Sequence, residues 1–468
     1  MAGLSDDIIF APIRKQADLI KHKQLSPIEL TKAYLDRLEK IGPKLNAVVT
    51  ITRELALKQA KAAEAEIAAG KYRGPLHGIP YGVKDLLATK DIPTTWGAEP
   101  YRKQVFDYDA TVIQKLTDAG AVLCAKLAMV ELAGGFNYGS ADASFTGPGR
   151  TPWNLDYWSG GSSSGSAAAV AAGLVSFAIG SETSGSIITP STFCGVAGLR
   201  PTYGRVSRHG AMALCWTLDK LGLLAHSAEC CGLVLSAIAG HDPLDASSAK
   251  RIFQYPEPQL DAGKKYRIGV LKPGGQKEVV ENFKQSLKVL EKFCELVEDV
   301  ELPRMPFGAV VGTIVGAEGA AAFRDLLDSG KCKELRNPNC QWSGFGGAFI
   351  LAVDYIQALR VRGPMKRELA KLYSKFDAIV APSLATVAYP IGKDFAQAYP
   401  GVRGGSQLIP AGNAVGQPAI AVPNGFGENG LPTGIQFTGK AWSESRLLAI
   451  ATEYQKATDW HTKRPKIG

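Results

Sequence analysis

Two short blocks rich in serine and glycine carry the side chains of this sequence that are best suited to nucleophilic chemistry. The first block is GGSSSGS at residues 160–166, and the second is GSETSGS at residues 180–186. A serine hydroxyl becomes a good nucleophile only when a neighbouring base takes its proton. Turns of this kind also leave backbone N–H groups without helical partners. Each block alone is more typical of a tight turn, so the base decides whether catalysis is a reasonable hypothesis.

A buried lysine is one base that the sequence offers to these serines. Lys84 follows a turn rich in glycine and proline and stands between Val83 and the run Asp85-Leu86-Leu87. Burial lowers the pKa of a lysine and leaves a neutral amine that accepts a proton. An exposed residue at a strand end is the simpler interpretation of Lys84 taken alone.

Histidine-based and phosphate-binding alternatives receive less support. Residues 161–165 match the G-x-S-x-G elbow of α/β-hydrolases, which requires a strand directly before it and a downstream acid and histidine. Residues 154–161 are a poor strand candidate. None of the candidate histidines stands in a persuasive context: His209, His226, His241 and His461. The sequence contains neither a Walker pattern nor G-x-G-x-x-G, so phosphate binding is also disfavoured.

The elements that must position these residues follow the rhythm of an α/β protein. Ser26 and Pro27 are typical of a helix start, and Gly42 predicts its end. The stretch AAAVAAGLVSFAI between the two blocks predicts a helix followed by a strand. Further helices are predicted at 53–69, at 278–293 and from Ser443, and further strands at 121–125, 266–271, 376–382, 419–423 and 434–439. This alternation predicts one large α/β domain.

Composition narrows the possible classes of function. The net charge is +9, but the charges are scattered, so we expect a solvated surface rather than binding to nucleic acid. The eight cysteines form no C-x-x-C pair, which is typical of buried thiols in a reducing, cytoplasmic compartment. The start of the chain is not typical of a signal peptide, and no long apolar stretch predicts a membrane helix. No cluster has metal-ligand spacing, so we expect no metal and no cofactor.

Taken together, Lys84 and the two blocks resemble the amidase signature family. The lysine precedes Ser162 by 162 − 84 = 78 residues, and Ser162 precedes Ser186 by 186 − 162 = 24 residues. The resemblance extends over residues 160–207 and to SPIELTKAYLDRLEKIGPKLNAVV, LHGIPYGVKD, PAIAVPNGF and GLPTGIQFTGKAWSESRLL, so it covers most of the chain. It implies one domain over residues 1–468, with a mixed β-sheet flanked by helices on both faces. The implied parts are a signature core at about 74–232, a variable helical region with the substrate pocket at about 240–345, and C-terminal core elements at 376–468.

The resemblance also implies a reaction and a role for each matching residue. The reaction is hydrolysis of the C–N bond of linear amides through an acyl-enzyme. Ser186 matches the nucleophile, Ser162 matches the bridging serine after a cis peptide bond, and Lys84 matches the base. The backbone N–H groups of Thr183, Ser184, Gly185 and Ser186 match the oxyanion hole. The family implies no cofactor.

The sequence departs from the usual family pattern at several positions. Ser164 replaces a glycine of the first block, and Ser184 replaces a glycine of the oxyanion hole, which keeps the N–H but narrows the backbone range. Ile188 replaces an arginine that would pair with the acid at Glu182, so a buried Glu182 needs another partner. Ala128 stands where asparagine is common, in a stretch that resembles the loop on the substrate side. Substrate contacts are predicted there for Met129, Ala133, Gly134 and Gly135.

Apolar residues near the predicted site favour a small apolar or aromatic substrate. Met212, Leu214 and Trp216 predict an apolar wall, and residues 343–353 predict a pocket or entrance segment. We therefore expect a free-standing amidase, monomeric or homodimeric, that acts on amides and also on carbamates (as a urethanase) or esters, with no nucleic-acid or membrane partner.

Two alternatives remain open. One is the glutaminase chain (the A component) of a tRNA-dependent amidotransferase, in which Arg360 and Arg362 could hold a carboxylate, although surface arginines are the simpler interpretation. The other is a catalytically silent scaffold homologue, which the changes at Ser164 and Ser184 suggest.

Overall fold

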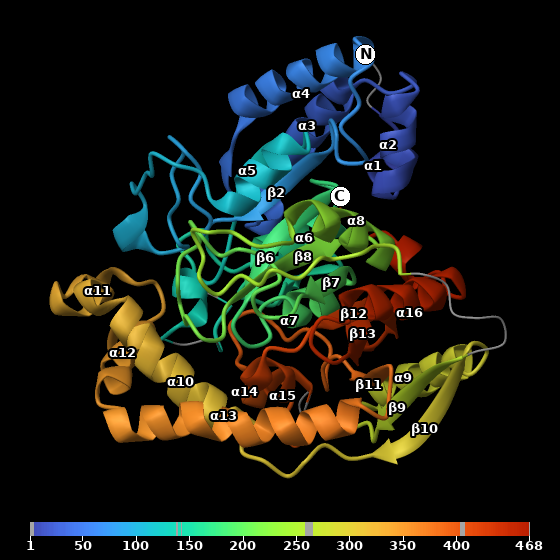
Figure 1. Cartoon of the computed structure of the whole chain (residues 1–468). Coiled ribbons are helices and arrows are strands. Elements are labelled where there is room, and N and C mark those ends of the chain that lie inside the picture. Colours follow the sequence, from blue (N-terminus) through green and yellow to red (C-terminus); the bar gives the residue numbers. More distant parts are fainter. Residues whose placement is uncertain (1–3, 137–138, 142, 258–264, 403–407, 468) are drawn as a thin grey trace.

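One mixed sheet runs through the computed structural model, which describes residues 4–136, 139–141, 143–257, 265–402 and 408–467. Within these ranges the sheet has eleven strands in the order β1-β3-β2-β6-β8-β7-β12-β13-β11-β9-β10 (Figure 1). Their bounds are β1 Val48–Ile51, β2 Pro80–Lys84, β3 Val122–Leu127, β6 Phe177–Glu182, β7 Ala197–Arg200, β8 Lys220–Ala225, β9 Tyr266–Leu271, β10 Cys294–Val300, β11 Ala378–Pro382, β12 Ala419–Phe426 and β13 Pro432–Thr438.

The two halves of the sheet contain parallel strands, and the middle is antiparallel. Strand β2 pairs in parallel with both β3 and β6, and β9 pairs in parallel with both β10 and β11. From β6 through β8, β7, β12 and β13 to β11 every neighbouring pair is antiparallel. The parallel trio β3-β2-β6 matters for function, because the carboxyl ends of parallel strands open at the same edge of a sheet.

Helices cover both faces of the sheet because the buried strands are apolar on both sides. In β6, Phe177 and Ile179 pack into one apolar cluster together with α8 and α16, whereas Ala178 packs into a second cluster together with α6. The helices are α1 Asp6–Ile9, α2 Ile13–Lys21, α3 Pro27–Leu45, α4 Arg53–Ala68, α5 Thr111–Asp118, α6 Ser164–Ala171, α7 Ile188–Cys194, α8 Ala228–Ile238, α9 Lys277–Leu290, α10 Phe307–Ala322, α11 Arg324–Asp328, α12 Cys340–Ala348, α13 Ala352–Tyr373, α14 Phe395–Ala398, α15 Leu408–Val415 and α16 Glu444–Lys456. The predicted α/β class, with a mixed sheet between helices, is confirmed.

Two local expectations are wrong. Helix α3 does not end at Gly42 but continues through Pro43 to Leu45, and the left-handed residue that follows it is Asn46. Gly42 instead allows close packing, because a Cβ there would lie 2.8 Å from Val48 Cγ2. The predicted poor strand before the first block does form β5, Asn154–Trp158, but β5 pairs only with β4, Arg150–Thr151, outside the main sheet.

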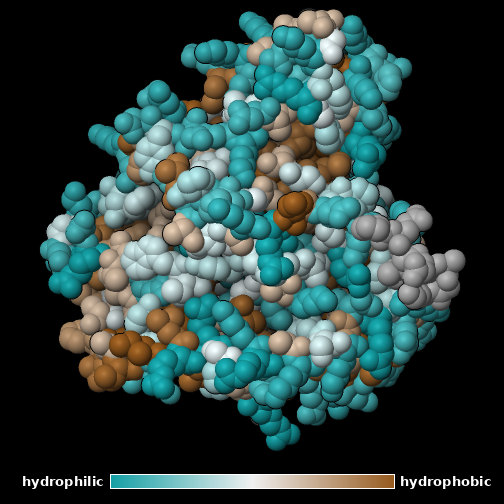
Figure 2. All heavy atoms as spheres, in the orientation of Figure 1, coloured by the Kyte–Doolittle hydropathy of each residue, from teal (hydrophilic) through white to brown (hydrophobic). Residues whose placement is uncertain are grey.

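Helices α10 to α13 form a layer at one side of the molecule, and the apolar surface of this layer is partly exposed. The exposed large apolar side chains there are Trp342, Phe345, Phe349, Leu351, Val353 and Ile356. In Figure 2 brown side chains gather at the lower left, over α12 and the start of α13. By length and hydropathy none of the described helices could cross a membrane alone, and only the pair α12 and α13, bent by 85°, meets those two criteria jointly.

The cysteines are free and buried, as the sequence predicts. All eight thiols lie inside the structure, at positions that range from β3 to α12: Cys124, Cys194, Cys215, Cys230, Cys231, Cys294, Cys332 and Cys340.

Candidate active site

The site lies where two neighbouring parallel strands end. Strand β2 ends at Lys84 and β6 ends at Glu182, and the register pairs Val83 with Ile179. The second serine/glycine block therefore begins inside β6 and continues beyond its carboxyl end. This arrangement brings a lysine from one strand and the loop after the other strand to the same edge of the sheet.

Lys84 is buried among hydroxyl groups. Its Nζ lies 2.7 Å from Ser162 Oγ and 2.9 Å from Ser181 Oγ. No carboxylate among the described residues lies within ion-pair distance of it, whereas the buried Lys126 pairs with Asp85 at 3.2 Å. Burial lowers the pKa of Lys84 to about 7, although Asp219 and Glu182 act in the opposite direction. Near neutral pH a large fraction of this amine is therefore uncharged and able to accept a proton.

The first block reaches Lys84 from the segment between β5 and α6. The peptide bond from Gly161 to Ser162 is cis. The N–H of Ser163 donates to the carbonyl of Ser186 at 3.3 Å, and its hydroxyl donates to the carbonyl of Ser181 at 3.2 Å. The two blocks are thus hydrogen-bonded to each other, and Lys84, Ser162 and Ser186 belong to one buried cluster.

Glycines and serines of the blocks occupy positions that suit their size. A Cβ on Gly165 would overlap the carbonyl of Ala47 and the backbone of Ala128, so only glycine allows α6 to approach this closely. Ser164, which departs from the family pattern, begins α6 and donates to the Ala128 carbonyl at 3.4 Å. The apolar helix α6 then holds the block in the core.

The loop after β6 exposes a row of backbone donors. The N–H groups of residues 183–186 donate no hydrogen bond to any described residue. Gly185 has φ +90°, which glycine adopts without strain, whereas Ser184 keeps a negative φ. The serine at 184 is therefore compatible with this loop, and the geometry agrees with the role predicted for these donors.

Glu182 has the alternative partner that the sequence departure requires. Arg200 at the end of β7 donates from Nη1 to Glu182 Oε1 at 2.7 Å, and both side chains are fully buried. Asn413 of α15 donates to the same oxygen at 2.8 Å. Burial would raise the pKa of Glu182, but Arg200 and these hydrogen bonds hold it at about 2.

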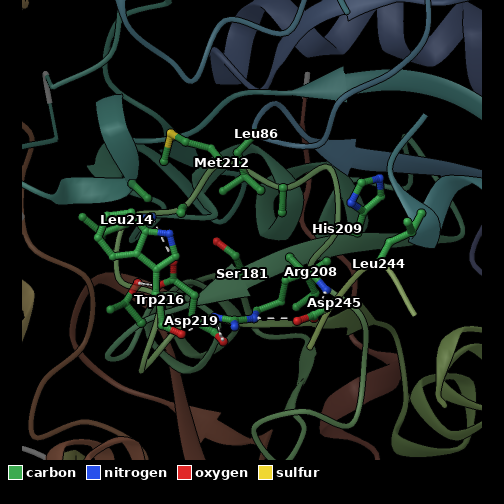
Figure 3. A pocket seen from close by; sticks show the side chains of 15 residues that line it. Leu86, Ser181, Arg208, His209, Met212, Leu214, Trp216, Asp219, Leu244 and Asp245 are labelled. Carbon is green, nitrogen blue, oxygen red and sulfur yellow. Dashed lines mark hydrogen bonds and ion pairs between the residues drawn. The ribbon is translucent and has the colours of Figure 1, made fainter. Parts of the chain in front are cut away.

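A cavity of about 220 Å³ lies beside this cluster and is lined by Ser181 and Thr183. Figure 3 shows Met212, Leu214 and Trp216 at one end of the cavity and His209 and Leu244 at the other. The three residues predicted as an apolar wall therefore lie together. Residues 343–353, predicted to line a pocket or its entrance, do not line this cavity.

The predicted substrate contacts divide into two groups. Ala133 lines the cavity, on a segment in which Leu132 and Ala133 both have positive φ, at 51° and 57°. Met129 is fully buried, and neither Gly134 nor Gly135 lines the cavity. Their roles stay predictions.

The arginines and histidines considered from the sequence lie elsewhere or serve other contacts. Arg360 is exposed. Arg362 turns inward and donates to the carbonyls of Ala414 at 2.7 Å and Thr217 at 3.1 Å. His226 is buried, and burial lowers its pKa to about 4. His241 accepts or donates at Ser248, at 3.0 Å.

Sequence reasoning missed three residues of the site. Ser181 is the second neighbour of Lys84, and it stands in the quoted block but received no role. Asp219 accepts a hydrogen bond from Thr183 Oγ1 at 2.6 Å and also lines the cavity. Lys220 donates to Asn413 Oδ1 at 2.7 Å and to the Thr183 carbonyl at 3.4 Å. The only signal was a pair of charged residues directly before the apolar strand β8.

Comparison with known proteins assigns the family. The amidase family model matches residues 29–448. The glutaminase-type A component of the glutamyl-tRNA(Gln) amidotransferase of Moorella thermoacetica is 35% identical over 490 aligned residues, which cover 99% of each chain. The chain belongs to the amidase signature family. The predicted resemblance is thereby confirmed, and with it the class of reaction, hydrolysis of amide C–N bonds.

Solved structures agree with the family and the fold. The peptide amidase of Stenotrophomonas maltophilia is 30% identical, with a TM-score of 0.82 over 97% of this chain and 98% of that one. A protein from a vestigial complex, described with the evolutionary origins of an s-triazine catabolic enzyme, is 31% identical, with a TM-score of 0.88 over 97% of this chain and 100% of that one.

No metal centre is visible in the part of the chain that the structure describes. Across those residues, no three side chains of His, Cys, Asp or Glu gather closely enough to hold a metal ion.

Proposed function

We propose that this chain is a serine amidase that cleaves amides with apolar or aromatic groups through an acyl-enzyme on Ser186. In this proposal Ser162 relays a proton, Lys84 is the base, and the N–H groups of residues 183–186 stabilise the oxyanion. Carbamates and esters are further substrates, because the same attack on a carbonyl cleaves them.

One observation carries the proposal: Lys84 Nζ lies 2.7 Å from Ser162 Oγ in a buried site without a carboxylate partner among the described residues. A structural buried lysine needs a compensating charge, as Lys126 finds in Asp85. A lysine without one is stable in its neutral form, which is the form that a base requires.

The proposed reaction balances its protons through this cluster. Neutral Lys84 takes the hydroxyl proton of Ser162 while Ser162 takes that of Ser186, and Ser186 Oγ forms a bond to the substrate carbonyl carbon. The carbonyl oxygen becomes an anion that accepts hydrogen bonds from the N–H groups of residues 183–186. The C–N bond then breaks and the proton returns through Ser162 to the leaving amine. Water, deprotonated by the same relay, releases the acid and regenerates Ser186.

The shape and chemistry of the cavity support an apolar substrate. Met212, Leu214 and Trp216 offer apolar contacts, and Ser181 and Thr183 face the same cavity from the catalytic side. A volume of about 220 Å³ suits a single aromatic or medium aliphatic group.

The test is hydrolysis of a p-nitroanilide with a medium acyl chain by the wild type and by Ser186→Ala. We expect turnover by the wild type and a loss of at least about 10³-fold in the variant, because the acyl-enzyme cannot form. Unchanged turnover in Ser186→Ala would disprove the assignment of the nucleophile.

A second candidate is the glutaminase chain of an amidotransferase, because the matched relative from Moorella thermoacetica is named as the A component of such an enzyme. In that case the isolated chain would hydrolyse neither p-nitroanilides nor glutamine, and glutamine hydrolysis would require added partner subunits. The inward contacts of Arg362 with two backbone carbonyls leave it less free to hold a substrate carboxylate.

A silent scaffold is the third candidate. A fluorophosphonate probe distinguishes it, because a scaffold would not be labelled at Ser186. The undistorted φ at Ser184 gives no structural reason for inactivity.

A further inference from the structure

The carboxylate of Glu182 holds the two ends of the loop that carries Ser186. Its Oε2 accepts the N–H of Ile187 at 2.9 Å and the N–H of Ile188 at 3.1 Å. Residues 183–186 are therefore enclosed between the backbone of Glu182 and the contacts of its own side chain. Because these bonds occupy the donors just after Ser186, the donors of residues 183–186 remain without a partner among the described residues.

A single buried cation balances this carboxylate directly. Arg200 donates from Nη1 to Glu182 Oε1 at 2.7 Å and from Nε to the Gln417 carbonyl at 3.1 Å. Lys220 approaches from β8 but bonds to Asn413 and not to the carboxylate. A buried carboxylate that loses its cation either takes up a proton or moves, and both changes weaken its bonds to backbone donors.

The origin of this cation is specific to this sequence. Where the usual family pattern has an arginine, Ile188 is fully buried and packs with Ala419 and Ala421. Strand β7 supplies the charge instead, from a position that is adjacent in space and twelve residues later (200 − 188 = 12) in the sequence.

We propose that Arg200 is a positioning residue for this site, which holds Glu182 so that the loop of residues 183–186 keeps its backbone donors and Ser186 in place. This proposal rests on the function proposed above. Arg200 touches no reacting atom, and its effect passes through Glu182 to Ile187 and Ile188.

The decisive experiment is a loss and its rescue. Arg200→Leu should lower kcat for the p-nitroanilide by about 100-fold with little change in KM, because it displaces the donors that stabilise the transition state and not the cavity. Adding Ile188→Arg should recover at least about tenfold of this loss, since it returns a cation to Glu182 from the usual family position. Failure of this rescue in a folded double variant would overturn the proposal.

Arg205→Leu is the matched control. Arg205 forms an equally buried ion pair with Glu444, at 2.9 Å, but lines a different cavity. We expect a comparable fall in Tm with an unchanged kcat. If Arg205→Leu lowers kcat as much as Arg200→Leu does, the effect is general destabilisation and the proposal is wrong.

Gly412→Ala perturbs Arg200 without removing any charge. A Cβ on Gly412 would overlap Arg200 Nη2, which has no hydrogen-bond partner among the described residues. This variant should lower kcat by about tenfold and leave KM unchanged. An unchanged kcat would contradict the proposal, and this milder variant keeps the test valid if Arg200→Leu does not fold.

Amide hydrogen exchange provides a readout that does not depend on turnover. The peptide that contains Ile187 and Ile188 should exchange at least about tenfold faster in Arg200→Leu than in the wild type, and Ile188→Arg should restore its protection. If the wild type hydrolyses no amide, the proposed function fails, and exchange still decides the role of Arg200. Unchanged exchange in Arg200→Leu would overturn the positioning role.

Discussion

Two buried lysines near the site have lowered pKa values, and only their contacts distinguish their roles. Burial lowers the pKa of Lys84 to about 7, and burial together with Arg200 lowers that of Lys220 to about 7 as well. Lys84 contacts two serine hydroxyls, whereas Lys220 contacts an amide oxygen and a backbone carbonyl. A proton acceptor must reach the proton that it takes, so geometry assigns the base to Lys84.

The pH dependence of activity tests this assignment. We expect kcat/KM to rise with pH through a midpoint near 7, because protonated Lys84 cannot accept the proton of Ser162. Lys84→Met should lower kcat by at least about 10³-fold. Lys220→Met should leave the midpoint in place, and a midpoint that disappears in Lys220→Met while Lys84→Met keeps it would reverse the assignment.

At the residue level the sequence predicts the members of the site better than their support. Lys84, Ser162 and Ser186 stand out because their types and spacing are local features of the chain. Ser181 and Arg200 do not, because their roles arise from contacts between strands that are distant in sequence. The departure at Ile188 indicated that Glu182 needs a partner, but only the pairing of β7 with β8 identifies it.

At the scale of elements, the close approach of α6 to the strand β3 and its neighbours depends on one glycine. Gly165→Ala should destabilise the protein by about 1–3 kcal/mol, the usual cost of overpacking a core, because its Cβ has no space beside Ala47 and Ala128. Urea unfolding measures this difference.

Gly312→Ala in α10 is the matched control, because nothing lies within 4 Å of the added Cβ. It should stabilise the protein by up to about 1 kcal/mol, since alanine favours a helix over glycine. Equal effects of the two substitutions would contradict the assigned role of Gly165.

Element boundaries are predictable where local chemistry determines them. The strand predicted at 266–271 coincides with β9, and Ser443 precedes α16 as expected. The end of α3 was missed because Gly42 serves packing against Val48 rather than termination. Packing of this kind depends on a partner element, which periodicity in one segment does not reveal.

At the scale of the whole molecule, the class of the fold was predictable but the order of the strands was not. Alternating helices and apolar strands predict an α/β protein. The sequence contains no local signal that β7 lies between β8 and β12, or that antiparallel strands separate two parallel groups. These pairings decide which side chains meet at the carboxyl end of β6.

The eight buried thiols make the protein a reporter of its own opening. Burial raises the pKa of Cys124, Cys194 and Cys294 well above that of a free thiol, so an alkylating reagent meets neither an accessible nor an ionised sulfur in the native state. We expect almost no labelling in native buffer and eight labels in denaturant, measured by intact mass.

The order in which the thiols become labelled then maps which parts of the chain open first. Cys332 and Cys340 belong to the layer beside the exposed apolar surface, whereas Cys124 and Cys194 belong to the central sheet and α7. In mild denaturant the first pair should react before the second if the helical layer separates from the sheet before the sheet itself unfolds. Simultaneous labelling of all four would mean that the chain opens as one cooperative unit. A set of residues with no part in catalysis thus records the mechanical hierarchy of the fold, one sulfur at a time.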